Sequence, residues 1–259
     1  MVRIFYSLLV LSLLTSCVNT YNITGTSSIP HLDGRMLYLK SYKNEQLKTV
    51  DSCEIIHGEF MLTGTIDSTK FVSLFMDEDN IMPVVLEDGD ILIRIDNANI
   101  KATGTPLNNR LTEFIEEQVS IQNDIMELSH KHSQAIMEGM NMEHVNIQLM
   151  REHESLTKKE DKLITSFITE NFDNVLGPGV FLMMTAGHEF PELSPWIEDI
   201  MSKATDKFKN DPYVKDYYEK ACRNQDIMNG MAIPDTPAMP QQSQMSPALT
   251  PAQLAQPAN

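Results

Sequence analysis

Basic residues are scarce in this sequence: 20 Lys and Arg stand against 36 Asp and Glu, and the formal net charge is −16. Nucleic-acid binding depends on Lys and Arg that neutralise phosphates. No basic stripe is present, so we expect no nucleic-acid partner. The same acidity disfavours a polybasic contact with anionic lipid headgroups. The chain is nevertheless 42% hydrophobic, which is enough apolar material for a core.

Cysteine is also scarce, because 259 residues hold only Cys17, Cys53 and Cys222, and no C-x-x-C pair occurs. Disulfide exchange needs a thiolate with a second thiol nearby. Cys53 and Cys222 could form a disulfide in an oxidising compartment, or each could be a small buried side chain. His188-Glu189 does not extend to H-E-x-x-H, and G-x-S-x-G and P-loop motifs are absent. We therefore expect no enzymatic activity, no catalytic residues and no cofactor.

Long hydrophobic runs are missing as well. The run from Ile4 to Leu14 has eleven residues, whereas a membrane-spanning helix needs about 20. A basic Arg3, a short apolar stretch and small residues before a cut site are typical of a secretory signal. The segment Leu14-Thr15-Ser16-Cys17 resembles the lipobox of bacterial lipoproteins, which are cut before the cysteine that then carries lipid. We therefore expect residues 1–16 to be a signal peptide.

The residues that follow the cut site indicate where such a lipoprotein would reside. Cys17 is the expected lipidation site, and residues 17–21 would form the tether to the membrane. After Cys17 the chain reads Val18-Asn19-Thr20-Tyr21, without the acidic run expected of a surface-export signal. We therefore expect a lipid anchor in a membrane outside the cytoplasm, namely the outer membrane, with the protein facing the periplasm.

Residues 22–104 predict antiparallel β-structure, because short alternating apolar runs recur with turn residues between them. In the clearest run, Ile91, Ile93 and Ile95 point to one face. Residues 71–76 are apolar on both faces, which predicts a central strand. About eight strands are expected, enough for a β-sandwich-like domain.

The apolar spacing changes at Thr105-Pro106, where Thr can cap a helix and Pro suits its first position. Residues 106–171 predict two long helices that pack as an antiparallel hairpin, the second of which begins near Asn141. The first helix carries a heptad seam, formed by Leu111, Phe114, Gln118, Ile121, Ile125, Leu128, His132 and Ala135. This seam could be buried within the hairpin or could meet a second chain, so the oligomeric state stays open.

Shorter helices are expected over residues 177–224, which would complete a helical domain at 105–226. Gly177-Pro178-Gly179 precedes an apolar segment, and Ser194-Pro195 and Asp211-Pro212 each suit a cap and a first helical position. Residues 227–259 are expected to be a disordered tail, because the last 29 residues hold six prolines and one charge. The predicted fold class is α+β, with an antiparallel β-sandwich-like domain before an all-α domain that contains the hairpin.

Histidine and methionine crowd both arms of the predicted hairpin. Thioether and imidazole together could suit Cu(I), and the histidines concerned are His130, His132, His144 and His153. They have no compact ligand spacing, and methionine often fills packing gaps between helices. No metal site is therefore assigned, and metal binding by these residues stays an alternative.

The N-terminal half also resembles a known family. The motifs that carry the resemblance come in the family's order: Tyr21-Asn-Ile-Thr-Gly-Thr26, Asp33-Gly34, Gly58 to Ile66, Pro83 to Ile91 and Ala102 to Asn108. They are similar to the β-rich domain of unknown function 4369 at the N-terminus of Gram-negative envelope lipoproteins. In many of those proteins a helical segment follows, and then a thioredoxin-like domain. Residues 105–226 are similar to that helical segment.

The resemblance implies a fold and an envelope location, but no catalytic residues. Where the family's thioredoxin-like domain would begin, this chain reads Ala232-Ile-Pro-Asp235 and continues with low-complexity residues. We therefore expect a non-catalytic, periplasm-facing lipoprotein that binds another envelope component. Two alternatives stay open: an accessory partner of a separate thioredoxin-like oxidoreductase, and a Met/His metal-binding protein.

Overall fold

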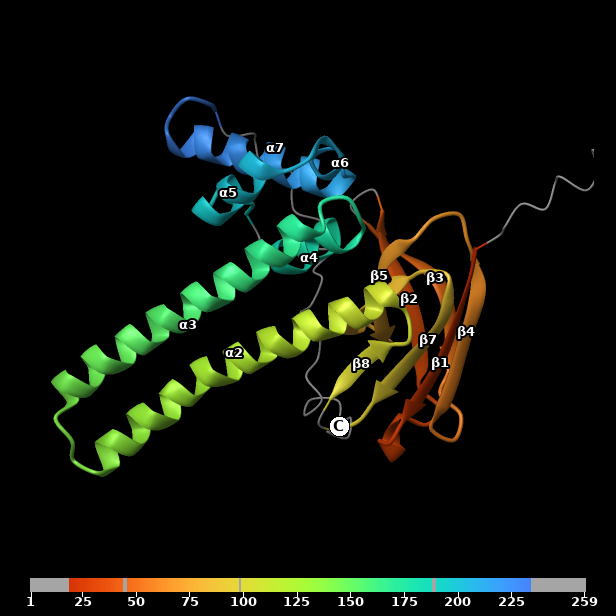
Figure 1. Cartoon of the computed structure of the whole chain (residues 1–259), viewed down its shortest axis with the longest axis horizontal. Helices are drawn as coiled ribbons and strands as arrows, with labels where there is room; N and C mark the ends of the chain where they lie inside the picture. Colours follow the sequence, from red (N-terminus) through yellow and green to blue (C-terminus); the bar gives the residue numbers. More distant parts are fainter. Residues whose placement is uncertain (1–18, 44–45, 98, 188–189, 234–259) are drawn as a thin grey trace, which may run out of the picture.

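The computed structural model describes residues 19–43, 46–97, 99–187 and 190–233. The expected signal peptide, Cys17, the pair at 188–189 and the tail beyond residue 233 lie outside the described residues. Within those ranges eight strands are followed by six α-helices (Figure 1). This order confirms the predicted α+β fold class, and the change from strands to helices falls between Thr103 and Pro106.

The strands form two four-stranded sheets, with the orders β4-β1-β7-β8 and β3-β2-β5-β6. Apolar side chains from both sheets share one core, so the sheets pack face to face. The strand bounds are β1 Asn19–Ser27, β2 Met36–Lys43, β3 Gln46–Glu54, β4 Glu59–Ile66, β5 Lys70–Met76, β6 Asp79–Leu86, β7 Gly89–Ile95 and β8 Ile100–Thr103, and a 3-10 turn, Pro30–Leu32, lies between β1 and β2.

The alternation that predicted the strands corresponds to the two faces of each sheet. Ile91, Ile93 and Ile95 are fully or almost fully buried between the sheets, whereas Leu92 between them is 53% exposed. The run at residues 71–76 is central as predicted, because β5 lies between β2 and β6. Its two apolar faces have different partners: Val72 and Leu74 pack in the sandwich core, and Phe71 packs against the helices.

One pairing differs from the prediction of an antiparallel domain. β1 and β7 run parallel, with Tyr21 aligned to Gly89 and Ser27 to Ile95. The chain reaches β7 from β6 of the other sheet, so it enters beside β1 by a crossover rather than by a hairpin. Buried and exposed residues alternate in the same way in parallel and antiparallel strands, so the pattern could not reveal the direction.

The helices are α2 Pro106–Met137, α3 Met142–Glu170, α4 Leu176–Thr185, α5 Pro195–Lys203, α6 Asp206–Lys209 and α7 Pro212–Met228. Thr105, Ser194 and Asp211 are N-cap residues with proline at the next position, as predicted. None of the described helices combines the length and the apolar character that crossing a bilayer would require.

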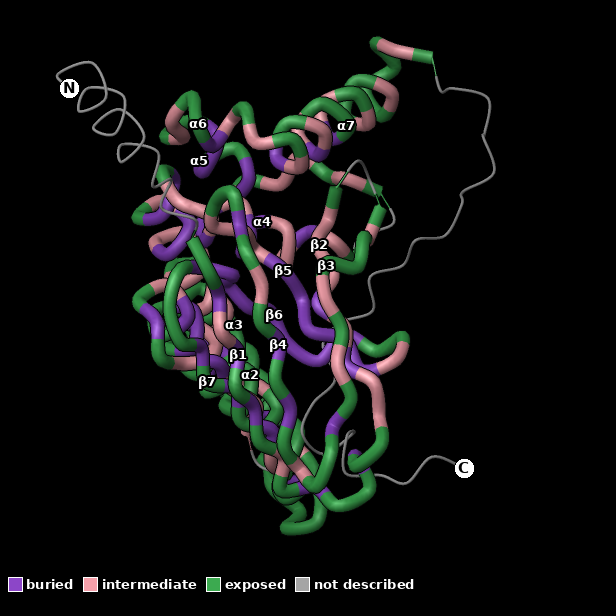
Figure 2. The backbone as a smooth tube through the Cα atoms, turned by 90° about the vertical axis from the view of Figure 1, so that its right-hand side faces the viewer, coloured by how far each residue is buried: buried purple, intermediate pink, exposed green. Residues whose placement is uncertain are grey.

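Three helical predictions need correction. Gly177-Pro178-Gly179 lies inside α4 rather than before it, and proline is tolerated there because the first-turn N–H groups have no helical acceptor. The short helix α6 was not predicted. α7 continues to Met228, beyond the predicted limit of 224 and past the start of the expected tail at 227. The last turns of α7 are largely exposed, so the sequence gives no apolar signal for them (Figure 2).

The predicted heptad seam is present and lies within the hairpin. Each of its eight residues is buried or half-buried, and Ile121 is fully buried. The stripe on α3 is less covered, because Val145, Leu149 and Leu156 are half-buried and only the base of α3 is fully buried. The structure therefore places the seam of α2 against α3. Of the two possibilities left open by the sequence, the seam buried within the hairpin is the one observed.

Candidate interaction surface

The hairpin projects as a long arm from the rest of the molecule (Figure 1). α2 has 32 residues, so it is about 48 Å long at 1.5 Å per residue. Three contacts fix its antiparallel register: Arg110 to Glu170 at 2.8 Å, Gln122 to Glu160 at 3.1 Å and Lys131 to Glu152 at 2.5 Å. These contacts thus hold α2 and α3 together along the length of the arm.

A buried asparagine joins the base of the arm to the sandwich. Asn108 is fully buried, and its amide pairs with both backbone groups of Val85 in β6. Its Oδ1 accepts from the Val85 N–H at 2.9 Å, and its Nδ2 donates to the Val85 carbonyl at 2.7 Å. The side chain therefore provides the hydrogen bonds that a neighbouring strand would otherwise make.

The carboxylate of Glu87 binds the first turn of α2. Its Oε1 accepts from the backbone N–H groups of Leu107 at 2.8 Å and Asn108 at 3.1 Å. These N–H groups have no acceptor within the helix, and a negative charge is favourable at a helix N-terminus. Thr112, one turn further, donates through Oγ1 to the Ala102 carbonyl in β8 at 2.5 Å. The direction of α2 relative to the sandwich is thus fixed by several hydrogen bonds.

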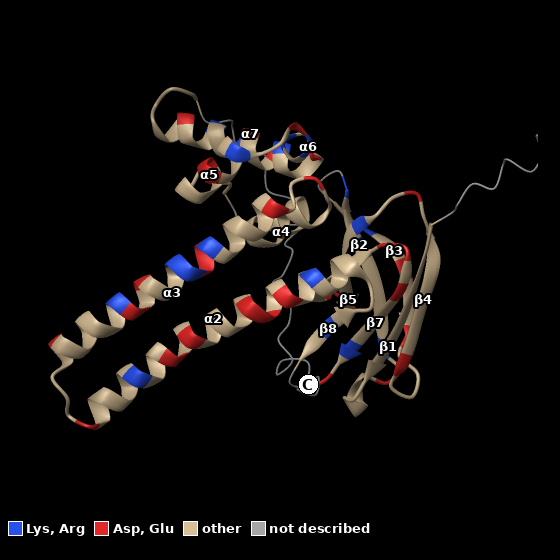
Figure 3. Ribbon diagram, viewed as in Figure 1, with Lys and Arg blue, Asp and Glu red and all other residues tan. Residues whose placement is uncertain are grey.

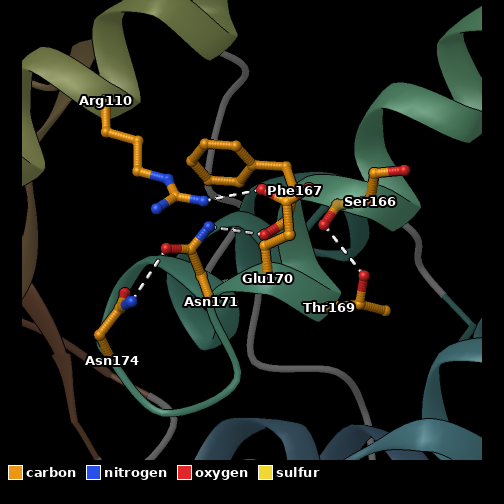
Figure 4. Close-up of polar contacts among 7 residues, drawn as sticks. All are labelled: Arg110, Ser166, Phe167, Thr169, Glu170, Asn171 and Asn174. Carbon is orange, nitrogen blue, oxygen red and sulfur yellow. Dashed lines mark hydrogen bonds and ion pairs between the residues drawn. The ribbon is translucent and has the colours of Figure 1, made fainter.

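The other end of the base is held where α3 turns into α4 (Figure 4). Arg110 pairs with Glu170, and its guanidinium lies 5.7 Å from the centre of the Phe167 ring. Asn171 Nδ2 donates to the Phe167 carbonyl at 2.7 Å, and its Oδ1 accepts from Asn174 Nδ2 at 2.9 Å. This amide chain closes the end of α3, whose last carbonyls would otherwise lack donors.

Helices α4 and α7 pack against the outer face of the second sheet. A Cβ at Gly179 in α4 would lie 2.2 Å from the ring of Phe71, so only glycine permits this approach. Tyr213 in α7 contacts the ring of Tyr42 edge-on at 5.3 Å, and its hydroxyl lies 2.9 Å from the Thr185 hydroxyl. Burial is the main cause that raises the pKa of Tyr213 to about 12, so the phenol stays neutral here.

The far end of the arm exposes apolar side chains. Ile136 is 57% exposed, Met137 80% and Met140 52%. Gly139 between them has φ +67° and reverses the chain, and Asn141 Oδ1 caps α3 by accepting from the His144 N–H at 3.3 Å. We call Ile136, Met137 and Met140 the tip. A cluster of exposed apolar residues at the end of a projecting arm is a feature of binding surfaces.

The two described cysteines do not form a disulfide, and the surroundings of Cys53 do not favour a reactive thiolate. Cys53 is half-buried beside the sandwich core, and Cys222 lies in α7 of the helical part. Burial, followed by the charge of Asp51, raises the pKa of Cys53 to about 11. A thiol with this pKa is almost fully protonated near neutral pH and is a poor nucleophile. The candidate disulfide between Cys53 and Cys222 is not formed.

The four candidate histidines do not form a ligand set. His130, His144 and His153 are exposed, and His132 is half-buried on the seam. Across the described part of the chain, no three His, Cys, Asp or Glu side chains come close enough to hold a metal ion. A shallow hollow of about 260 Å³ lies near the end of α5, lined by Met201, Lys209, Lys215, Tyr218 and Glu219, and its charges are of mixed sign.

Sequence reasoning missed Glu87 and Asn108, which fix the arm. Asparagine is a poor helix former that is favoured near helix starts, so its place two residues after Pro106 was a usable signal for a local role. No signal in the sequence could indicate Val85 as its partner, because that contact depends on how the helix and sheet meet.

The strand order and its junction with α2 agree with a comparison against protein families. Residues 21–111 match the model of the domain of unknown function DUF4369. This chain carries a DUF4369 domain. The DUF4369 match covers the sandwich and ends in the second turn of α2, so the joint made by Glu87 and Asn108 lies inside it. Most of the hairpin and α4 to α7 lie beyond the DUF4369 match, and their similarity to the helical segment of such lipoproteins stays a prediction. No curated protein matches the chain.

Proposed function

We propose that this protein is a non-catalytic, periplasm-facing lipoprotein that binds another component of the cell envelope through the tip of its hairpin. The observation that carries the proposal is the tip itself, where Met137 is 80% exposed at the end of an arm of about 48 Å. An exposed apolar cluster costs solubility unless a partner covers it. Methionine is also suited to binding, because its flexible thioether adapts to partner surfaces.

The rigid base supports the same proposal. Arg110, Asn108 and Glu87 fix both helices where they leave the body, so the tip has a defined position before a partner arrives. A preorganised surface loses less conformational entropy on binding than a mobile one. The arm would then act as a spacer that presents the tip away from the sandwich.

Binding is tested by site-specific photo-crosslinking of the full-length protein in intact cells of its source. A photoreactive amino acid in place of Met137 should give one discrete adduct with an envelope protein. The matched control is Met228, which is 84% exposed at the end of α7 and lies outside the tip. Equal adducts from both positions, or none from Met137, would contradict the proposal. If the adduct contains a thioredoxin-like oxidoreductase, the accessory role is the correct form of the function.

The anchor is tested separately. We propose that Cys17 carries the lipid, on the basis of its lipobox-like sequence. Cells labelled with a fatty-acid analogue should incorporate it into the wild-type chain and not into Cys17→Ser, which should also lose its signal-peptide processing. Labelling that persists in Cys17→Ser would refute this assignment, whatever the tip binds.

A further inference from the structure

The start of β1 lies very near the expected lipid anchor. Residues 17–21 are the expected tether, but residues 19–21 are part of β1, where each is paired with a residue of β4. Only Val18 therefore separates Cys17 from Asn19, the first residue of the sandwich. Two residues of extended chain span at most about 7 Å. A lipid on Cys17 would thus hold the start of β1 close to the bilayer surface.

The end of the sandwich at which β1 begins is here called the anchor end. β4 finishes there, because Asn19 is aligned with Ile66, and β5 begins there after a short loop. The turn before β7 is at the same end, since the Thr20 N–H donates to Asp88 Oδ1 at 2.9 Å. β2 is antiparallel to β5, so β2 finishes at this end as well. The anchor end consists of Asn19, Lys43, Asp67, Ser68, Lys70 and Asp88.

The anchor end carries both signs of charge. Lys70 Nζ lies 2.6 Å from Asp67 Oδ1, and Lys43 and Asp88 add one charge of each sign. Glu87 of the neighbouring turn is buried against the start of α2. The charges at the surface of this end therefore balance, although the whole chain has a net charge of −16. Because anionic headgroups repel acidic surfaces, the anchor end meets less repulsion at a bilayer than an average surface of this chain.

The arm leads away from the anchor end. β7 is parallel to β1 and β8 is antiparallel to β7, so β8 runs back toward the anchor end. α2 then reverses direction along β8: Thr112 bonds to the Ala102 carbonyl, and Glu116, one turn later, pairs with Lys101 at 3.8 Å. In Figure 1, accordingly, β1 starts at the right of the molecule and the loop between α2 and α3 lies at the far left.

We propose that the anchor end rests on the bilayer that holds the lipid, and that the arm presents the tip away from this bilayer to a protein partner that stands clear of its headgroups. This inference rests on the lipid anchor proposed above for Cys17. With the arm at 45° to the bilayer normal, a helix of about 48 Å lifts the tip about 34 Å beyond the base of α2. The tip would then contact neither the lipids of its own membrane nor a segment embedded in them.

The alternative is that the molecule lies flat, with the arm along the bilayer. The charge of α2 opposes this arrangement, because the field of anionic headgroups repels acidic residues. Figure 3 shows acidic residues along the length of α2. An upright arm places most of them beyond the Debye length, which is about 8 Å at physiological ionic strength. The exposed charges of α2 are Glu113, Glu116, Glu117, Asp124 and Glu127, against Arg110 and Lys131.

The test is fluorescence quenching in vesicles of phosphatidylethanolamine, with phosphatidylglycerol as the minor anionic component and a nitroxide on the headgroups of some lipids. Full-length lipidated protein carries one fluorescent amino acid at an exposed position: Ser68 at the anchor end, Met137 in the tip, or Glu59. Glu59 is the matched control, because the length of β4 separates it from the anchor end by about 23 Å. Quenching should be strong at Ser68, several-fold weaker at Glu59 and absent at Met137.

Flotation of the vesicles separates this inference from the anchor itself. The wild-type protein should float with the vesicles, and Cys17→Ser should not. A floating protein that is quenched equally at Ser68 and Met137 has a flat arm or an inserted tip, and one quenched no more at Ser68 than at Glu59 has another face on the bilayer. Either result overturns the proposal. A wild-type protein that does not float would overturn the anchor, and this inference with it.

The length of the tether gives an independent test. A flexible insert of about twelve Gly and Ser residues between Val18 and Asn19 adds roughly 20 Å of root-mean-square reach. The anchor end is then no longer held on the bilayer, so quenching at Ser68 should fall about twofold or more while flotation persists. Unchanged quenching at Ser68 would show that the short connection to Cys17 does not position the anchor end, which contradicts the proposal. Photo-crosslinking at Met137 reports on the partner of the tip separately.

Discussion

Replacing Asn108 by alanine should destabilise the protein more than any exposed substitution nearby. The asparagine amide satisfies the N–H and the carbonyl of Val85, at 2.9 and 2.7 Å, in a fully buried position. Alanine leaves both backbone groups without a partner, and each buried unsatisfied group costs about 1–3 kcal/mol. The expected loss is therefore about 2–6 kcal/mol, a large share of the 5–15 kcal/mol that is typical of folded proteins.

Urea unfolding measures this loss through two signals. Far-UV circular dichroism reports the whole chain, and fluorescence of Trp196, the single tryptophan, reports the helical core in which it is packed. The midpoint should fall by roughly 1 M in both signals. The matched control is Asn109→Ala, which removes one exposed bond to the Gly104 N–H at 3.0 Å and should cost about 1 kcal/mol or less. A change under 0.5 kcal/mol for Asn108→Ala, or equal losses for both variants, would refute the reasoning.

Three further predictions concern packing and ionisation. Gly179→Val should cost about 1–3 kcal/mol because its side chain would overlap the Phe71 ring, and thermal melts should show less than additive loss when Phe71→Ala is combined with it. Cys53, with a pKa of about 11, should react with alkylating reagents about tenfold faster per pH unit between pH 8 and 10, and a rate that levels off below pH 9 would contradict this. Burial, followed by the hydrogen bond to Asp51, raises the pKa of Tyr21 to about 12 from 10.0; the folded state then holds a proton that the unfolded state loses, so the melting temperature should fall as pH rises from 10 to 12.

Features that depend on local spacing could be predicted from the sequence. The alternation at Ile91, Ile93 and Ile95 defined a strand face, and the heptad spacing from Leu111 to Ala135 defined the hairpin seam, because each pattern matches the period of its own element. Pairs of a capping residue and proline, such as Asp211-Pro212, predicted helix starts. Proline is compatible with the first turn of a helix, and the side-chain oxygen of a residue such as aspartate accepts hydrogen bonds from the first-turn N–H groups. These signals need no knowledge of distant residues.

Features that depend on contact between elements could not be predicted. The parallel pairing of β1 with β7 has the same residue pattern as an antiparallel pair, so only the path of the chain between sheets determines it. The start of α4 is a second case, because Gly177 approaches the backbone at the end of α3 and Gly179 approaches the ring of Phe71. The tip is of this kind as well: its apolar residues are evident in the sequence, but their exposure at the end of the arm follows only from the pairing of α2 with α3.

The hydrogen bonds of Asn108 with the sandwich determine how rigidly the arm holds its exposed residues. A helix of 32 residues that was free to pivot at its base would move its far end through several ångströms for each few degrees of rotation. Glu87, Asn108 and Thr112 bind the base to two strands at once, which resists rotation in more than one direction. The tip is thus held at a fixed position relative to the sandwich. Loosening these contacts at the base should therefore weaken the binding proposed for the tip, even though none of the residues at the base lies in the tip.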